Sequence, residues 1–247
     1  SQVENTVKLL DEGNTVPFIA RYRKEMTGSL DDQIIRQLSE RLTALRNLEE
    51  KREQVKNAIA EQGNLTEELA MKLDAAETQT EIDDIYRPFR PKRRTRASIA
   101  KEKGLQPLAD MIFGQKLIGS LEEYASAFVD REKGVETVED ALAGASDIIA
   151  EDLSDDPEIR KALRSLMNRR AVLVSKASDP ENDSVYRLYY DFSAPISRLQ
   201  GHQILALNRG EKEEFLKVTV ELPGNEGSAC VCRKALKPGP VVSQFVR

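Results

Sequence analysis

The sequence predicts an all-α protein, a multi-helix elongated bundle with a helix-turn-helix-like part and at most one or two short strands. Two observations predict this class. Apolar residues recur every three or four positions along most of the chain, which is the spacing of one face of a helix. Several of these segments follow Ser, Thr, Asp or Asn, the residue types that cap helix N-termini, often with Glu three positions further on.

The composition is that of a folded and highly charged protein. Apolar residues make up 40% of the 247 residues and charged residues 32%, and the formal net charge is −5. No apolar run approaches the roughly 18 to 20 residues that span a bilayer. The polar N-terminus does not resemble a signal peptide. We therefore expect a cytoplasmic protein without membrane contact and, because the chain begins without methionine, a fragment of a longer one.

The N-terminal region predicts a pair of short helices. The first covers residues 3–12 and ends at Gly13, and the second begins near Thr15 and ends at Gly28. The second has an apolar face of Phe18, Ile19, Tyr22 and Met26, and its other sides carry Arg21, Arg23 and Lys24. Two short helices across a glycine turn, the second of them basic, have the outline of a helix-turn-helix, although any helical hairpin gives this pattern.

A long third helix is predicted from Ser29 or Asp31 to about Gln62. Its apolar stripe consists of Ile35, Leu38, Leu42, Leu45, Leu48, Val55 and Ile59. This spacing suits either a helix packed along one side within the protein or a coiled-coil surface for a partner. We favour the intramolecular helix because the stripe breaks near Arg52 and few heptads are complete.

The rest of the chain predicts more helices and little strand. Capping signals at Asn64, Thr80, Ser120, Thr137 and Asp156 predict five helices, and Pro107 predicts one more. A further helix is expected within residues 200–208. Residues 171–174 are short and β-branched, which fits a strand or the end of a helix, and residues 216–222 alternate as a strand with no evident partner. Strand is therefore expected only in short pieces near residues 171–175 and 216–222. The expected parts are residues 1–62, a helical region 63–210, a strand segment 211–223 leading to a missing domain, and a tail 224–247, without helical or strand period, that does not belong to the fold.

The strongest functional signal is a basic strip, defined as residues 87–103. It holds eight basic residues and one acidic residue, a local balance of +7. Its two prolines and its adjacent like charges predict an exposed, extended loop. Guanidinium groups match phosphate oxygens, so the strip predicts contacts to a nucleic-acid backbone, unless its arginines pair with the protein's own carboxylates. The candidate contact residues are Lys92, Arg93, Arg94, Arg96, Lys101 and Lys103, together with Arg21, Arg23 and Lys24.

The opposite extreme of charge is an acidic segment, defined as residues 136–158. It holds nine acidic residues and no basic one. It is a docking site for a basic partner, an intramolecular counter-surface for the basic strip, or a solvated face. A solvated face is the commonest role of such a run, and we favour it.

The residue types that support catalysis or metal binding are scarce. His202 is the single histidine, so no His-based metal cluster can be built, and it predicts a structural side chain. No P-loop or dinucleotide-binding glycine motif occurs. Cys230 and Cys232 are half of a zinc site at best and a poor disulfide, which favours a reducing compartment. We expect no catalytic residue, metal or cofactor.

Three segments of the chain together resemble one family. They are residues 3–28, with the run Pro17-Phe18-Ile19-Ala20-Arg21-Tyr22-Arg23-Lys24-Glu25, residues 85–109, with Tyr86-Arg87-Pro88-Phe89-Arg90-Pro91, and residues 189–211, with Tyr189-Tyr190-Asp191-Phe192 and Asn208-Arg209-Gly210-Glu211. In this order, they resemble the bacterial Tex family of transcription accessory proteins. Gly201 departs from the family pattern before His202, and the resemblance ends near Gly224.

The resemblance implies a multi-domain protein. A helical N-terminal region precedes a YqgF domain of ribonuclease H-like fold, helix-hairpin-helix modules and a C-terminal OB-fold that makes the principal nucleic-acid contacts. We expect this chain to end before those parts. It implies a non-catalytic scaffold, associated with transcription, that binds RNA or DNA weakly and without base specificity. The alternative is a helical protein-protein interaction module that docks transcription machinery through the acidic segment or the long helix, without direct nucleic-acid contact.

Overall fold

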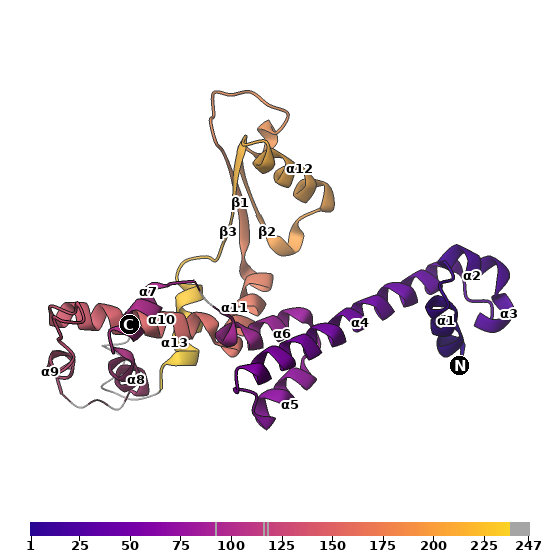
Figure 1. Cartoon of the computed structure of the whole chain (residues 1–247). Helices are drawn as coiled ribbons and strands as arrows, with labels where there is room; N and C mark the ends of the chain where they lie inside the picture. Colours follow the sequence, from indigo (N-terminus) through magenta and orange to yellow (C-terminus); the bar gives the residue numbers. More distant parts are fainter. Residues whose placement is uncertain (92, 116, 118, 238–247) are drawn as a thin grey trace. The chain divides into compact units, whose positions relative to one another are not determined.

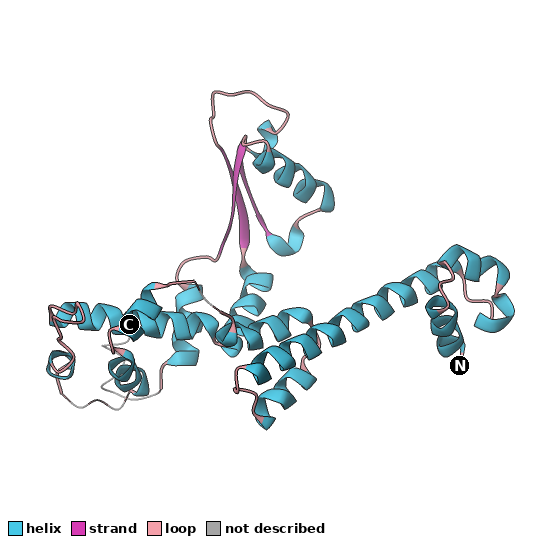
Figure 2. Cartoon of the chain, in the orientation of Figure 1, coloured by secondary structure: helices cyan, strands magenta, loops and turns pink. Residues whose placement is uncertain are grey.

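The computed structural model describes residues 1–91, 93–115, 117 and 119–237. Within them the chain forms thirteen α-helices, three 3₁₀ turns and one three-stranded sheet (Figures 1 and 2), which confirms the predicted, mostly helical class. The chain has two compact units, residues 1–89 and the residues from Arg90 onward. The division therefore differs from the one expected at residue 62, because the helices that follow residue 62 pack back on the long helix.

One long helix organises the first unit. The elements are α1 (Gln2–Asp11), α2 (Val16–Tyr22), α3 (Lys24–Thr27), α4 (Asp32–Glu61), α5 (Glu67–Ala75), α6 (Gln79–Tyr86) and a 3₁₀ turn over Arg87–Phe89. The expected second helix is interrupted, because the backbone at Arg23 has φ −129° and ψ 28°, so α2 and α3 are separate. Gly28 follows α3 in the left-handed conformation, as expected for a glycine at a helix end.

The helix starts follow from local capping. The carboxylate of Asp31 accepts a hydrogen bond from the backbone N–H three residues later, at 2.8 Å, and starts α4. The hydroxyls of Thr66 and Thr78 cap α5 and α6 in the same way. These caps lie two residues from the expected ones at Asn64 and Thr80.

Helix α4 connects two separate apolar clusters. At its start, Ile35 packs with Leu9 of α1 and Ile19 of α2. Towards its end it packs against α5 and α6 in a cluster that consists of Leu48, Val55, Ile59, Leu73, Ala76 and Ile82. Between the two, Leu42 is half-buried and Leu45 is 45% exposed. Both ends of α4 are therefore packed within the protein. Among the described residues, the middle of its apolar stripe belongs to neither of these two buried clusters.

The expected apolar face of the second helix is wrong. Ile19 is fully buried, but Phe18, Tyr22 and Met26 are 36%, 61% and 38% exposed. The break at Arg23 separates Met26 from the other three, and the buried side of so short a helix is narrow. Two aromatic rings of α2, Phe18 and Tyr22, are therefore on the surface.

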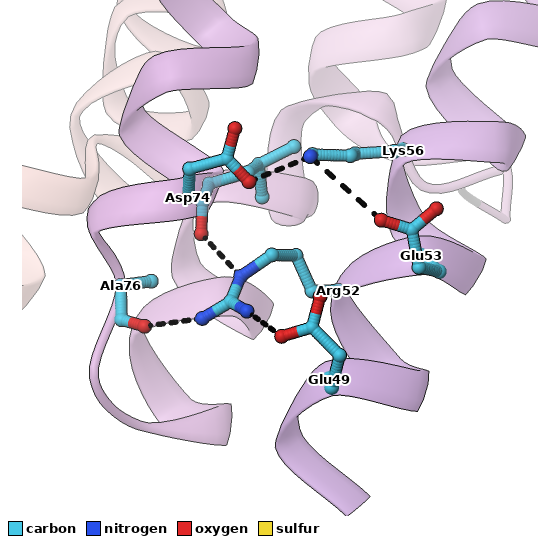
Figure 3. Close-up of polar contacts among 7 residues, drawn as sticks. Glu49, Arg52, Glu53, Lys56, Asp74 and Ala76 are labelled. Carbon is cyan, nitrogen blue, oxygen red and sulfur yellow. Dashed lines mark hydrogen bonds and ion pairs between the residues drawn. The ribbon is translucent and has the colours of Figure 1, made fainter. Parts of the chain in front are cut away.

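An arginine interrupts the apolar stripe of α4, and its contacts explain why (Figure 3). The side chain of Arg52 is 12% exposed and forms an ion pair with Glu49. Its Nε donates to the carbonyl of Leu73, and its Nη2 donates to the carbonyl of Ala76, both at 2.9 Å. The last carbonyls of a helix have no partner within that helix. Arg52 therefore supplies hydrogen-bond donors and a positive charge to the C-terminal end of α5.

A bidentate ion pair joins α1 to the middle of α4. The two carboxylate oxygens of Asp11 accept hydrogen bonds from Arg46 Nη1 and Nη2 at 2.7 and 2.9 Å. These hydrogen bonds hold the pKa of Asp11 below its ordinary value. Since the folded pKa lies below the unfolded pKa, the pair stabilises the unit above the unfolded pKa. This contribution is lost as the pH falls through the folded pKa.

Replacing Asp11 by Asn should therefore flatten the acid side of the stability profile. Between about pH 5 and pH 2, where such carboxylates titrate, the melting temperature of the wild-type chain should fall by more than that of Asp11→Asn. Circular dichroism melts across this range measure the difference. The control is Glu12→Gln, which removes an adjacent exposed carboxylate and should follow the wild type. Parallel profiles for Asp11→Asn and the wild type would show that the pair contributes nothing.

The second unit combines a helical part with a small sheet. Its helices are α7 (Arg96–Glu102), α8 (Gln106–Gly114), α9 (Leu121–Ser126), α10 (Val138–Asp155), α11 (Pro157–Arg170), α12 (Gly201–Lys212) and α13 (Glu226–Ala235), with 3₁₀ turns over Arg187–Tyr189 and Ile196–Arg198. Helices α7, α8 and α9 all pack against α10. Their shared core consists of Ala97, Ala100, Leu105, Leu108, Ala109, Ile112, Ala125, Val135, Ala141, Ala145 and Ile148.

The sheet joins three strands that are distant in the sequence. The central strand β1 (Val172–Ala177) pairs antiparallel with β2 (Asp191–Pro195) on one side and β3 (Leu216–Glu221) on the other. The two expected strands are confirmed. The expectation that the second has no partner is wrong, because β1 and β3 pair with each other. Strand β2 was not expected, since it is short and carries few β-branched residues.

The sheet has a defined register and packs with α12. Val174 in β1 lies opposite Ser193 in β2 and Thr219 in β3. Helix α12 packs against β3. Its Leu207 is buried in a cluster with Leu216 of β3 and Tyr186. This small sheet therefore has an apolar core of its own within the second unit.

The segment after residue 224 is part of the fold, which corrects the expectation of a tail without periodic structure. Residues 226–235 form α13, which packs against α11 and buries Cys230. Glu226 pairs with Arg170 at 2.6 Å, and Gln115 donates to the carbonyl of Ala235 at 2.7 Å. The inner side of α13 carries small residues, so a search for large aliphatic residues misses its period. Residues 238–247 lie outside the described residues.

Candidate nucleic-acid interface

The basic strip is only in part the extended loop that its prolines predict. The strip begins with the 3₁₀ turn over Arg87–Phe89, residues 93–95 have no regular structure, and α7 begins at Arg96. The expectation of a loop throughout is therefore wrong for residues 96–102. Both prolines of the strip precede this helix and leave it intact. Thr95 starts it through a capping box, in which its hydroxyl accepts from the Ser98 N–H at 3.0 Å and its own N–H donates to Ser98 Oγ at 2.9 Å.

Helix α7 packs against α10, which forms most of the acidic segment. Arg96 Nη2 lies 3.4 Å from the carboxylate of Asp147. Lys101 Nζ lies 3.7 Å from Glu151 and 3.5 Å from Asp152. The acidic segment is therefore, at these three carboxylates, an intramolecular counter-surface for the basic strip. It is not only the solvated face that we favoured.

The arginines at the start of α7 remain accessible despite these pairs. The side chain of Arg96 is 86% exposed, and that of Arg94, which pairs with Glu102 at 3.4 Å, is 71% exposed. Arg93 is exposed and forms no ion pair with the described residues. Ion pairs this exposed contribute only about 0 to 1 kcal/mol. A phosphate can therefore replace a carboxylate partner here at little cost.

The two lysines at the other end of α7 are held more closely by contacts within the protein. Lys101 is 38% exposed, and its partner Glu151, which is 16% exposed, also accepts a hydrogen bond from Thr95 Oγ1 at 3.0 Å. Lys103 Nζ donates to the carbonyl of Gly134 at 2.7 Å. The outward arginines are thus exposed to solvent, whereas these two lysines are held by other parts of the protein. Lys92 lies outside the described residues.

The other predicted basic residues lie in the first unit. Arg21 and Lys24 are exposed, and the guanidinium carbon of Arg23 lies 5.3 Å from the ring centroid of Phe18. The helix-turn-helix assignment stays a prediction, because α2 has seven residues and α3 has four. Sequence reasoning missed the exposed aromatic pair beside these cations, Phe18 and Tyr22. The available signal was their spacing of four residues among basic side chains.

The remaining chemistry of the described residues is sparse. Within the described ranges, no three His, Cys, Asp or Glu side chains are placed to hold a metal ion together. His202 is exposed on α12, and both cysteines carry free thiols. None of the helices in the described ranges has the length and apolar character needed to cross a membrane.

Comparison with known proteins gives matches along nearly the whole chain. The Tex-like protein N-terminal domain matches residues 1–60, and the Tex central region-like domain matches residues 120–238, which includes α13. The chain is 43% identical over 238 residues to YdcI of Bacillus subtilis and 39% identical over 223 residues to the transcriptional accessory protein Tex of Neisseria gonorrhoeae. It is 30% identical over 227 residues to the S1 RNA-binding domain-containing protein 1 of Homo sapiens.

These three alignments cover 95%, 89% and 88% of this chain, and 33%, 29% and 22% of the respective relatives. The chain thus spans a third or less of the length of these relatives. Two domains of one family match in order, and relatives of that family align along both units. The chain therefore belongs to the Tex family, of which it carries the N-terminal domain and the central region.

Proposed function

We propose that this chain is a non-catalytic, nucleic-acid-associated part of a Tex-like transcription accessory protein. Its ligand is the phosphate backbone of RNA or DNA, bound weakly and without base specificity. A cytoplasmic location, in keeping with the two free thiols, is part of the proposal. The observation that carries it is the group of outward arginines at the start of α7, Arg93, Arg94 and Arg96, in the most basic stretch of an acidic chain.

Phosphate is the ligand that this group suits best. Each guanidinium presents a planar fork of donors that matches two oxygens of one phosphate. Adjacent like charges repel each other, so a run of them favours an anionic ligand over exposure to water alone. Among the relatives, one is named a transcriptional accessory protein and another an S1 RNA-binding domain-containing protein, which supports a role near nucleic acid.

The alternative, a protein-docking module that uses the acidic segment, has less support. Asp147, Glu151 and Asp152 already have basic partners on α7. A basic partner protein would have to displace those partners. The long helix retains a partly exposed stripe at Leu42 and Leu45, so protein docking there stays the second candidate.

The test is to replace Lys92, Arg93, Arg94 and Arg96 together by alanine. The wild-type chain should bind single-stranded and duplex oligonucleotides with dissociation constants of about 10⁻⁴ to 10⁻⁶ M. The variant should bind all sequences more weakly, and its log–log salt dependence should flatten by about one unit for each phosphate that it no longer binds. Fluorescence anisotropy titrations at several salt concentrations measure both effects.

A second quadruple variant provides the matched control. Replacing Lys176, Arg187, Lys212 and Lys217 by alanine removes the same charge from exposed positions elsewhere in the second unit. This control should keep most of the affinity and the salt slope. If both variants weaken binding equally, the effect is one of net charge. If the strip variant binds like the wild type but melts earlier, its arginines serve the fold, and the proposal is wrong.

A further inference from the structure

The surface of α2 and α3 in the first unit combines aromatic rings with cations. The rings of Phe18 and Tyr22 lie 5.3 Å apart, and Tyr22 is 61% exposed. The guanidinium carbon of Arg23 lies 5.3 Å from the centroid of the Phe18 ring. Arg21 and Lys24 are exposed close by in the sequence. Ring faces and cations thus lie within about two helical turns.

The surface of α2 and α3 carries a net positive charge. Arg21, Arg23 and Lys24 are basic, and Glu25 is the one acidic residue in this stretch. None of the three forms an ion pair with a described carboxylate, whereas Arg94, Arg96 and Lys101 of the second unit do. Aromatic faces with unpaired cations beside them suit an anionic ligand that also has flat apolar rings.

The backbone beneath these side chains is held in place. Ile19, between the two aromatic residues, is fully buried in the cluster with Leu9 and Ile35. Helix α3 is hydrogen-bonded to α1, because Asn5 Nδ2 donates to the carbonyl of Met26 at 2.9 Å. The rings therefore lie on a fixed support, which lowers the entropy lost when a ligand stacks on them.

We propose that Phe18 and Tyr22 form a stacking platform for unpaired bases of single-stranded nucleic acid, with Arg21 and Lys24 contacting the adjacent phosphates. A duplex hides its base faces within the stack, so the platform selects single strands. Stacking is tolerant of sequence because every base has an aromatic face. The inference shares its ligand class with the proposed function and uses none of the residues of the basic strip, so each can fail alone.

The experiment compares two probes on the full chain. One is a labelled single strand of about 12 nucleotides, as oligo-dT or oligo-rU, and the other has the same phosphates with abasic sugars. The wild type should bind the base-bearing strands about tenfold more tightly than the abasic strand, the typical effect of one stacked base. Tyr22→Leu should lose this preference without changing the salt slope, because no phosphate contact is removed.

Further variants separate stacking from folding and charge. Tyr22→Phe keeps the ring and should keep the preference. Arg21→Ala with Lys24→Ala should keep it too, but flatten the salt slope by about one unit per phosphate contact. Phe113→Leu removes an exposed ring of the second unit, 39% exposed against 61% for Tyr22, and should change nothing.

The inference is overturned if the wild type binds both probes equally, if it binds neither, or if Tyr22→Leu retains the preference. If the basic-strip variant loses affinity and Tyr22→Leu keeps the base preference, the proposed function stands and the platform is wrong. If the basic-strip variant keeps its affinity and Tyr22→Leu loses the base preference, the platform stands and the proposed role of the basic strip is wrong. Binding to neither probe removes both.

Discussion

Replacing Gly144 by leucine should destabilise the second unit strongly. A Cβ atom built at Gly144 would lie 2.3 Å from Leu105 Cδ1 and 3.3 Å from the Cβ of Ala100. Leu105 is 1% exposed and Ala100 is 3% exposed, so neither has free space into which it can move. The contact lies where α10 packs against α7 and against Leu105, the N-cap of α8. A larger side chain must therefore displace Leu105 or push α10 away from these elements.

The expected cost follows from overpacking a core. Such insertions cost about 1 to 3 kcal/mol, and a whole leucine side chain should reach or exceed the upper end. For a unit of this size, that lowers the melting temperature by roughly 6 to 12 °C. Circular dichroism melts measure it. The change should also weaken the ion pairs between α7 and the acidic segment, because they depend on the same helix contact.

Two further variants identify the cause. Gly201→Leu makes the same substitution at an exposed helical position with nothing within 4 Å, and it should leave stability nearly unchanged. Leu105→Ala, which is destabilising by itself, should restore part of the stability that Gly144→Leu removes, since it opens the space that the new side chain needs. Additive effects of the two changes, or a wild-type melt for Gly144→Leu, would contradict the close contact.

Replacing Arg52 by alanine should have the largest effect in the first unit. The side chain is 12% exposed and donates to the carbonyls of Leu73 and Ala76 at the end of α5. Hydrogen bonds from a charged group contribute about 1.5 to 3 kcal/mol each, and a buried carbonyl left without a donor adds a desolvation penalty. We expect a loss of roughly 2 to 4 kcal/mol.

The measurement is urea unfolding followed by circular dichroism, with hydrogen exchange of the α5 amides as a local readout. Arg52→Lys should be intermediate, because an ammonium lacks the planar fork that reaches two carbonyls. Arg41→Ala, an exposed position on the same helix, controls for the missing charge and for helix propensity. A wild-type exchange rate in α5 of Arg52→Ala would show that the arginine does not hold this helix end.

At α7, the ion pairs with the acidic segment and the phosphate contacts of the proposed function use the same basic side chains. Arg96 pairs with Asp147 while it remains 86% exposed, so under the proposed function a phosphate would compete with Asp147 for the same side chain. Lys101 faces Glu151 and Asp152 and is less free to exchange. The basic strip is therefore divided by its helix into an outward and an inward part, a division that charge counting does not show.

The helical class, the family and many of the helix starts can be predicted from the residues alone. Asp31, Thr137 and Asp156 were expected as caps, and each caps its helix in the structure. Capping is predictable because the bond joins residues about three positions apart. Gly28 is predictable for a similar reason, since the left-handed conformation that it adopts is a property of the single residue.

Which sides of these elements are buried, and which segments meet, depends on the tertiary structure. It paired β1 with β3 across about forty residues, placed α13 against α11, and set the basic α7 on the acidic α10. It also left Phe18 and Tyr22 on the surface while burying Ile19 between them. These outcomes depend on contacts between residues far apart in the chain, whose free energies no local pattern contains. Helix caps are local, so several of them could be predicted, as could the positions of the basic residues. The pairing of those residues with carboxylates, and the exposure of the two aromatic rings, depend on how distant segments pack together.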